Sequence, residues 1–103
     1  MAALTAAPAT RARSVSDRGE IARFLRTDRL YAAYALGDLD GPHRSRVAWA
    51  IASDDAGRPT ALVMHHEGLV PQPLFLMGAP DGCRAILEHV IKPRDAYLQG
   101  IEL

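Results

Sequence analysis

The chain has 103 residues, with twelve basic and twelve acidic side chains and a single cysteine, so it forms one domain or part of one and no intrachain disulfide. The cysteine usage favours a reducing, cytoplasmic setting. The formal net charge of zero argues against nucleic acid and an anionic membrane as partners, and no apolar run reaches the roughly 18 residues that a membrane span needs.

The N-terminal region reads as a leader followed by two helices. We expect residues 1–15 to be a flexible leader, because they are rich in Ala and Thr and lack the apolar core of a secretory signal. Asp17 is placed as a helix cap, with Glu20 completing a capping box, which predicts a helix over 17–26. A second helix is expected over 29–36. Gly37 is its expected stop, with a loop over 37–42. Leu30, Tyr31, Tyr34 and Ala35 recur at helical spacing along one stripe, and the two tyrosines are expected to make core or interdomain contacts.

The rest of the chain alternates strands and turns. Segments 47–51 and 60–66 predict an antiparallel hairpin, with Val47, Trp49 and Ile51 on one face and Gly57 in a turn that needs positive φ. A third strand over 74–77, a helix over 80–91 and a short strand over 96–99 follow. The predicted fold class is α+β (mixed α/β), in the order α-α-β-β-β-α-β. It has about four strands in a mixed sheet and a βαβ unit at its end.

The junction after the third strand is the main candidate for chemistry. Gly78 and Gly82 flank a strand-to-helix turn, a place where backbone N–H groups and the helix dipole often hold phosphate. Pro80 has no N–H to donate, and Asp81 would repel a phosphate and is a better N-cap for the helix itself. Arg84 is the nearest cationic support. The alternative to an anion site is a capped turn with a structural role only.

The order of elements resembles the first part of the GNAT N-acetyltransferase fold. Segment 28–40, DRLYAAYALGDLD, is similar to a stretch in N-terminal domains that precede the catalytic GNAT domain of bacterial two-part acetyltransferases. In those domains a Trp-bearing strand, a hairpin, a Gly-Pro turn with its helix, and a Tyr-Leu-Gln strand follow, as they do here over 47–51, 60–66, 75–80 and 96–99. The resemblance covers about residues 17–100, within a domain over 16–103.

This resemblance implies a GNAT-like half whose catalytic partner lies in a C-terminal domain, which would bind acetyl-CoA and acetylate an amine. The catalytic signature, Gln/Arg-x-x-Gly-x-Gly/Ala, is degenerate over 77–82, where the Gln/Arg is missing. The chain alone therefore carries at most a remnant loop of Gly78, Gly82 and Arg84. The implied roles of the chain are interdomain packing and shaping of the acceptor cleft, without a cofactor of its own.

His65, His66 and Glu67 are the remaining candidates. Adjacent strand residues point to opposite faces, so the two histidines cannot chelate one metal, and no metal site is expected. One histidine is expected inward or at the sheet edge and the other in solvent. A general-base role for His65, His66 or Glu67 at a substrate cleft is the alternative. Cys83 lies on the apolar face of the last helix and is expected to be buried rather than nucleophilic.

Two other functions remain open at this point. One is a self-standing binding or regulatory module, in which a second copy of the chain closes the open sheet edge. The other is a minimal acyltransferase that uses the 78–82 turn and therefore binds coenzyme A.

Overall fold

The structure, a computed structural model, describes residues 10–42, 44–67 and 72–92. Strands, α-helices and two short 3-10 helices (η) follow in this order: β2 (Arg11–Val15), α1 (Arg18–Leu25), η1 (Arg26–Asp28), α2 (Ala33–Leu39), η2 (Arg44–Arg46), β3 (Val47–Ser53), β4 (Pro59–His66), β5 (Leu74–Gly78) and α3 (Pro80–His89). This arrangement confirms the α+β class.

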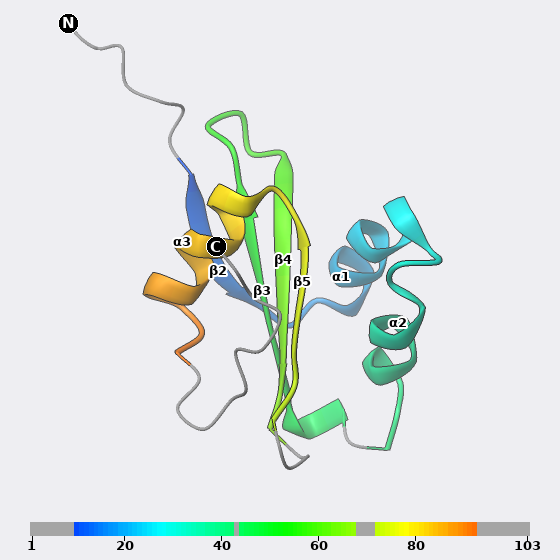
Figure 1. Ribbon diagram of the computed structural model, residues 1–103. Helices are drawn as coiled ribbons and strands as arrows, with labels where there is room; N and C mark the ends of the chain where they lie inside the picture. Colours follow the sequence, from blue (N-terminus) through cyan, green and yellow to red (C-terminus); the bar gives the residue numbers. More distant parts are fainter. Residues whose placement is uncertain (1–9, 43, 68–71, 93–103) are drawn as a thin grey trace, which may run out of the picture.

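The four strands form one sheet in the order β2-β3-β4-β5, and every neighbouring pair is antiparallel. Helices α1 and α2 cover one face of the sheet and α3 covers the other (Figure 1). The predicted hairpin is confirmed, with Trp49 opposite Met64 and Ala50 opposite Val63. The sheet was expected to be mixed, but it is wholly antiparallel in the described part. The segment 96–99, and with it the βαβ unit, lies outside the described residues.

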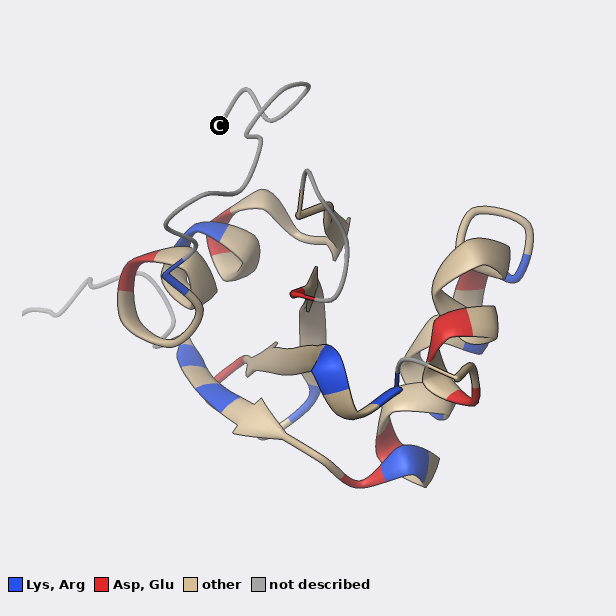
Figure 2. Cartoon of the chain, turned by 90° about the horizontal axis from the view of Figure 1, so that it is seen from below, with Lys and Arg blue, Asp and Glu red and all other residues tan. Residues whose placement is uncertain are grey.

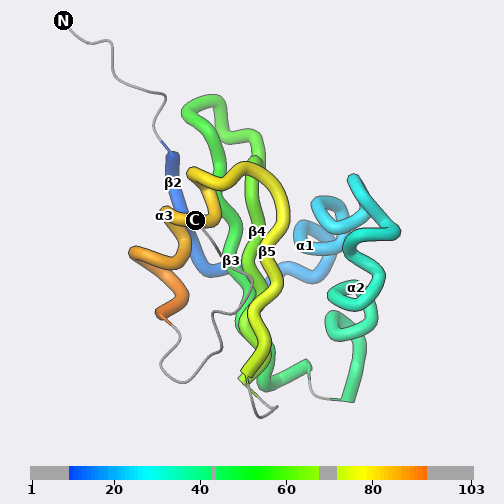
Figure 3. Tube along the Cα trace, in the orientation of Figure 1, coloured from blue at the N-terminus to red at the C-terminus, as the bar shows by residue number. Residues whose placement is uncertain are grey.

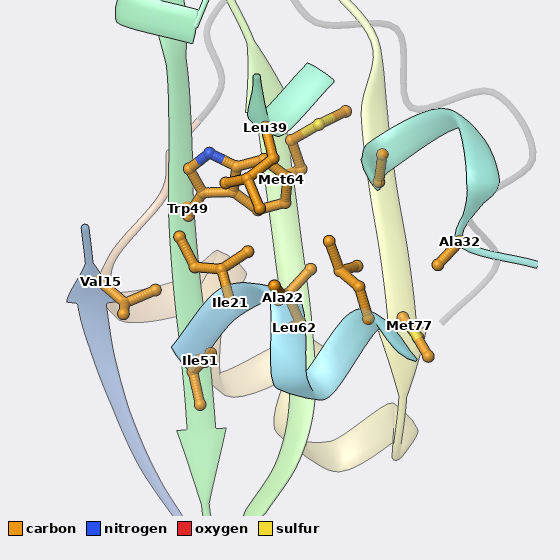
Figure 4. Close-up of a cluster of buried hydrophobic side chains, with 12 residues drawn as sticks. Val15, Ile21, Ala22, Ala32, Leu39, Trp49, Ile51, Leu62, Met64 and Met77 are labelled. Atoms are coloured by element: carbon orange, nitrogen blue, oxygen red, sulfur yellow. The ribbon is translucent and has the colours of Figure 1, made fainter. Parts of the chain in front are cut away.

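The sheet separates two apolar clusters, because successive strand residues point to opposite faces. On the α1–α2 face, Trp49, Ile51 and Leu62 pack against Ile21 and Leu25 (Figure 4). On the α3 face the strands contribute small side chains, and α3 packs closely on them through the following residues: Ala50, Ala52, Ala61, Val63, Cys83 and Ile86. Cys83 is buried, as expected.

Helix α1 begins where its capping residue predicts. The Asp17 carboxylate accepts hydrogen bonds from the backbone N–H groups of Gly19 (2.9 Å) and Glu20 (3.2 Å). These bonds satisfy two of the donors that a helix N-terminus leaves unpaired. The expectation that Asp17 caps this helix is therefore confirmed.

Strand β2 was not anticipated, because Arg11–Val15 falls within the expected leader. It pairs with β3 along its whole length, with Val15 opposite Trp49. Val15 is buried on the α1 face, and Ala12 packs on the α3 side. Arg13, on the same face as Val15, forms an ion pair with Glu20 of α1. Charged side chains are typical of an edge strand, since they discourage further pairing.

Helix α2 lies later in the sequence than expected and turns a different face inward. Asp28 accepts the Tyr31 N–H at 3.2 Å and organises a separate turn. The helix itself then runs from Ala33 to Leu39, so Gly37 lies within it rather than at its end. The residues that face the sheet are spaced at i, i+3, i+4 and i+7: Ala32, Ala35, Leu36 and Leu39. Leu30, Tyr31 and Tyr34 are exposed instead.

Helix α3 begins at Pro80, with Ala79 as its N-cap residue and no side-chain cap. Asp81 was expected to cap it, but Asp81 lies inside the first turn. Proline suits the first helical position, because the N–H that it lacks would be unpaired there in any case. The helix ends at His89, two residues before the expected Ile91.

The β3–β4 turn carries a charge that stabilises it. The Asp54 carboxylate accepts backbone N–H groups from Arg58 (2.9 Å) and Ala56 (3.0 Å), and Gly57 has φ of 83°, as expected. The hydrogen bond from the Arg58 N–H, foremost, and that from Ala56 hold the pKa of Asp54 below its ordinary value.

A pH prediction follows from this turn. Because the pKa of Asp54 is lower in the folded chain, its contribution to stability is present above the unfolded pKa and is lost as the pH falls through the folded pKa. We expect Asp54→Asn to lower stability at pH 7 and to flatten the fall in stability below about pH 5, measured by urea unfolding across pH. Asp55→Asn, in the same turn, is the control. Parallel curves for wild type and Asp54→Asn would contradict this prediction.

Candidate functional site

A pocket of about 550 Å³ lies beside the β5–α3 junction. The connection between α1 and α2 lies on the same side of the sheet as these two helices (Figure 3), and its residues Thr27, Asp28 and Tyr31 form the opposite wall. The lining residues are Phe24, Thr27, Asp28, Tyr31, Leu76, Met77, Gly78, Pro80 and Cys83. The turn singled out in the sequence therefore does border a pocket.

Packing alone explains the first glycine of this turn. Gly78 has φ of 99°, a conformation that side-chain-bearing residues rarely adopt. A Cβ at this position would lie 2.3 Å from the Thr60 carbonyl oxygen and 2.9 Å from the Ala61 Cα. The close approach of β5 to β4 therefore requires glycine, whether or not a ligand binds.

The second glycine has the same kind of explanation. Gly82 is buried in the first turn of α3, where a Cβ would lie 2.6 Å from the Ala61 Cβ and 3.2 Å from the Ala52 Cβ. The missing side chain lets the helix approach the two central strands closely. Neither glycine is therefore an indication of phosphate binding by itself.

The pocket has no cationic side chain to hold an anion, among the residues that line it in the described part of the chain. Its charged side chain is Asp28, which would repel a phosphate. Arg84, the expected cationic support, is exposed on α3 and does not line the pocket. Pro80 lacks an N–H, and Asp81 adds a negative charge to the first helical turn.

The Cys83 thiol lies in the pocket wall, 3.7 Å from the Met77 carbonyl oxygen. Burial raises the pKa of this thiol, more than the contact with Met77 lowers it. The thiolate is the nucleophilic form of cysteine, so a raised pKa works against a nucleophilic role. Cys83 contributes apolar surface to the pocket instead.

His65 and Glu67 meet each other but lie away from this pocket. His65 is buried, with its Nδ1 3.6 Å from a Glu67 carboxylate oxygen and its Nε2 3.0 Å from the Gln72 side-chain oxygen. His66 is buried as well, which corrects the expectation that one histidine faces solvent. The general-base candidates therefore do not line the pocket beside the Gly-rich turn.

Tyr31 connects the pocket to the free edge of the sheet. Ala79 donates to Thr60 and His66 donates to Pro73, so residues 73, 75, 77 and 79 direct their backbone groups toward β4. The groups of Leu76 point the other way, and the Tyr31 hydroxyl donates to the Leu76 carbonyl at 2.8 Å. The Tyr31 ring also packs on Phe75, with centroids 5.3 Å apart.

The segment that carries Tyr31 is also the most apolar exposed surface in the described part of the chain. Leu30 is 92% exposed, Tyr31 57% and Tyr34 64%, and these are the large apolar side chains with high exposure there. Within the described residues, no strand pairs with the outer edge of β5. An apolar surface beside an open strand edge is typical of an interaction site.

Comparison with models of protein families, with curated proteins and with solved structures finds no match to the chain. Within residues 10–42, 44–67 and 72–92, no three His, Cys, Asp or Glu side chains gather closely enough to hold a metal ion. In the same ranges, no helix has both the length and the apolar character needed to cross a membrane.

Proposed function

We propose that the chain is the non-catalytic, N-terminal part of a GNAT-family N-acetyltransferase. Acetyl transfer from acetyl-CoA to an amine would be carried out by a C-terminal catalytic domain outside these 103 residues. The observation that supports this proposal is the β5–α3 junction. It keeps a strand, a glycine turn and a helix beside a pocket, but it lacks the backbone donor at Pro80 and carries acidic groups at Asp28 and Asp81.

The order of the described elements is consistent with this proposal. The two helices, the hairpin, the third strand and its helix follow one another as in the stretch on which the resemblance rests. The exposed surface of Leu30, Tyr31 and Tyr34 beside the free edge of β5 is where we place the contact with the catalytic domain. The pocket next to that surface is our candidate for the part of the acceptor cleft that this chain supplies.

Binding of coenzyme A separates this proposal from a minimal acyltransferase. We expect a calorimetric titration of the chain with coenzyme A or acetyl-CoA at about 1 mM to give no heat beyond dilution, because the turn offers no cation. A protein that extends past Leu103 in the same reading frame should contain an Arg/Gln-x-x-Gly-x-Gly/Ala loop and bind acetyl-CoA. Saturable binding of coenzyme A to the present chain would contradict the proposal.

The alternative is a self-standing dimeric module in which two chains pair through the free edge of β5. The same exposed apolar surface would then lie in the dimer interface. Light scattering distinguishes the two, because the first proposal expects no stable self-association of this chain, and the alternative requires a dimer. A dimer whose reading frame stops after Leu103 would favour the alternative.

A further inference from the structure

A second pocket, of about 410 Å³, lies at the other end of the sheet from Gly78. It opens between the end of β2, the start of α1 and the η2 turn. Helix η2 is at the lower end of the molecule in Figure 1, and Figure 2 looks at that end and shows basic residues at η2 between the sheet and the α1–α2 layer. The lining residues are Ser14, Val15, Ser16, Arg18, Ile21, Leu39, Arg44, Val47, Ala48 and Trp49.

The floor of this pocket is apolar except for one polar atom. Val15, Ile21 and Leu39 belong to the core cluster around Trp49. Trp49 is only 7% exposed, yet its indole N–H makes no hydrogen bond with any described residue. In Figure 4 the nitrogen lies on the side of the ring away from Ile21. A donor at the pocket surface without a partner among the described residues is available to a ligand.

The rim adds further donors. The Ser16 hydroxyl and the Arg44 guanidinium likewise make no hydrogen bond or ion pair with any described residue. Ser14 borders the pocket from β2, but it lies opposite Ala50 on the α3 face of the sheet, so its side chain points away from the apolar floor. Arg18 is engaged with Asp40 at the rim. The hydrogen bond from Arg18, foremost, lowers the pKa of Asp40, and the charges of Arg44 and Arg26 add to it. The charges of three guanidinium groups thus act on the Asp40 carboxylate at this end of the molecule.

The two pockets have opposite electrostatics. The pocket at the Gly-rich turn contains the Asp28 carboxylate and no lysine or arginine among its lining residues. The second pocket is lined by the two arginines Arg18 and Arg44, together with Ser16 and Trp49. No described acidic residue lines it. A ligand with oxygen acceptors at one end suits this wall, because the guanidinium and indole groups can only donate and a serine hydroxyl can also donate. An apolar part of the ligand suits the floor.

We propose that the pocket formed by Ser16, Arg44 and Trp49 binds a small molecule that carries a carboxylate or phosphate group on an apolar body. The oxyanion lies between the Arg44 guanidinium and the Ser16 hydroxyl. The apolar body lies over Val15 and Leu39, within reach of the indole N–H. This site is separate from the acceptor cleft proposed above and does not depend on it.

The test uses Trp49 as the reporter, because it is the one tryptophan in the chain. Phenyl phosphate and benzoate are titrated separately, and both tryptophan fluorescence and the indole N–H resonance are followed. We expect a saturable change with at least one of them, and the comparison identifies which oxyanion is preferred. Benzylamine has a similar body and the opposite charge, so it should produce no saturable change.

Two arginine variants locate the binding site. Arg44→Gln removes the unpaired guanidinium and should weaken binding by about tenfold or more, because charge-assisted hydrogen bonds are the strong ones. Arg46→Gln is the matched control, since Arg46 is exposed on the same η2 turn and does not line the pocket. Its binding should change by less than about twofold. Both side chains are exposed, so an unchanged amide spectrum is expected to show that each variant folds.

The proposal is overturned by any of three results. The first is the absence of a saturable response to both anions up to about 10 mM, which is the weak end of specific binding. The second is an equal response to benzylamine, which would indicate a purely apolar contact. The third is unchanged binding in a folded Arg44→Gln variant, or an equal loss in Arg46→Gln, either of which would place the anion elsewhere.

Discussion

Gly78→Ala should lower the free energy of unfolding by about 2–4 kcal/mol, because the new Cβ meets the Thr60 carbonyl oxygen in a backbone conformation with φ of 99°. Relief of this contact would require β5 to move away from β4. The loss is measured as a shift in the urea midpoint at constant slope. The effect is purely structural, so it should be the same with or without coenzyme A.

Gly37→Ala is the matched control for this prediction. Gly37 lies inside α2, and a Cβ there would meet nothing within 4 Å. Alanine should therefore stabilise the chain by about 0.5–1 kcal/mol through the reduced flexibility of the backbone. If Gly78→Ala were as well tolerated as Gly37→Ala, the packing explanation of the Gly-rich turn would be wrong, and a ligand-binding reason for Gly78 would return.

Leu39→Ala should destabilise the chain by about 2–4 kcal/mol, whereas Leu30→Ala should change stability by less than about 0.5 kcal/mol. Leu39 is buried in the core cluster beneath α2, and Leu30 is 92% exposed. The two substitutions remove the same atoms. Their difference in free energy of unfolding, measured by chemical denaturation, therefore reports which face of this segment packs on the sheet.

The outcome for this pair also separates stability from association. If Leu30 lies in an interface, Leu30→Ala should weaken assembly with the catalytic domain or a second chain without lowering the stability of the isolated chain. Equal destabilisation by the two substitutions would contradict the observed face. It would instead support the face expected from the sequence, in which Leu30 and Tyr34 point inward.

The sequence correctly predicted the elements whose position depends on residues close together in the chain, such as a helix cap, an alternating strand or a turn glycine. The Asp17 cap located the start of α1, the alternation around Trp49 located β3, and Gly57 located the hairpin turn. Strand β2 was missed because its residues carry two arginines and a serine, with only Ala12 and Val15 packed inward. Its conformation is fixed by pairing with β3, which lies more than 30 residues away in the sequence.

The face of α2 was assigned wrongly for a different reason. Ala32, Ala35, Leu36 and Leu39 have helical spacing, but two of them are alanines, and the neighbouring tyrosines and Leu30 are larger. The large side chains of Leu30, Tyr31 and Tyr34 also have helical spacing, but the positions that face the sheet include the small side chains of Ala32 and Ala35. The Asp28 carboxylate also accepts the Tyr31 N–H, which organises a separate turn between the two helices.

The candidate site was only half predictable. The turn at Gly78 was found from its glycines and apolar strand, and it does border a pocket. Phe24, Thr27 and Asp28 form the opposite wall and carry no motif of their own, because they reach the pocket through tertiary packing. The second pocket is less visible still, since Ser14, Arg44 and Trp49 are separated in the chain and belong to three different elements.

The hydrogen bond from the Tyr31 hydroxyl to the Leu76 carbonyl joins the pocket wall to the free edge of β5. A strand that pairs with β5 across Leu76 needs the same carbonyl that the tyrosine hydroxyl holds. Because Tyr31 also forms part of the pocket wall, such pairing would free its ring and reshape the cavity. Strand pairing at Leu76 would therefore change the pocket wall, whereas contact with the exposed Leu30, Tyr31 and Tyr34 alone leaves the hydrogen bond and the pocket in place.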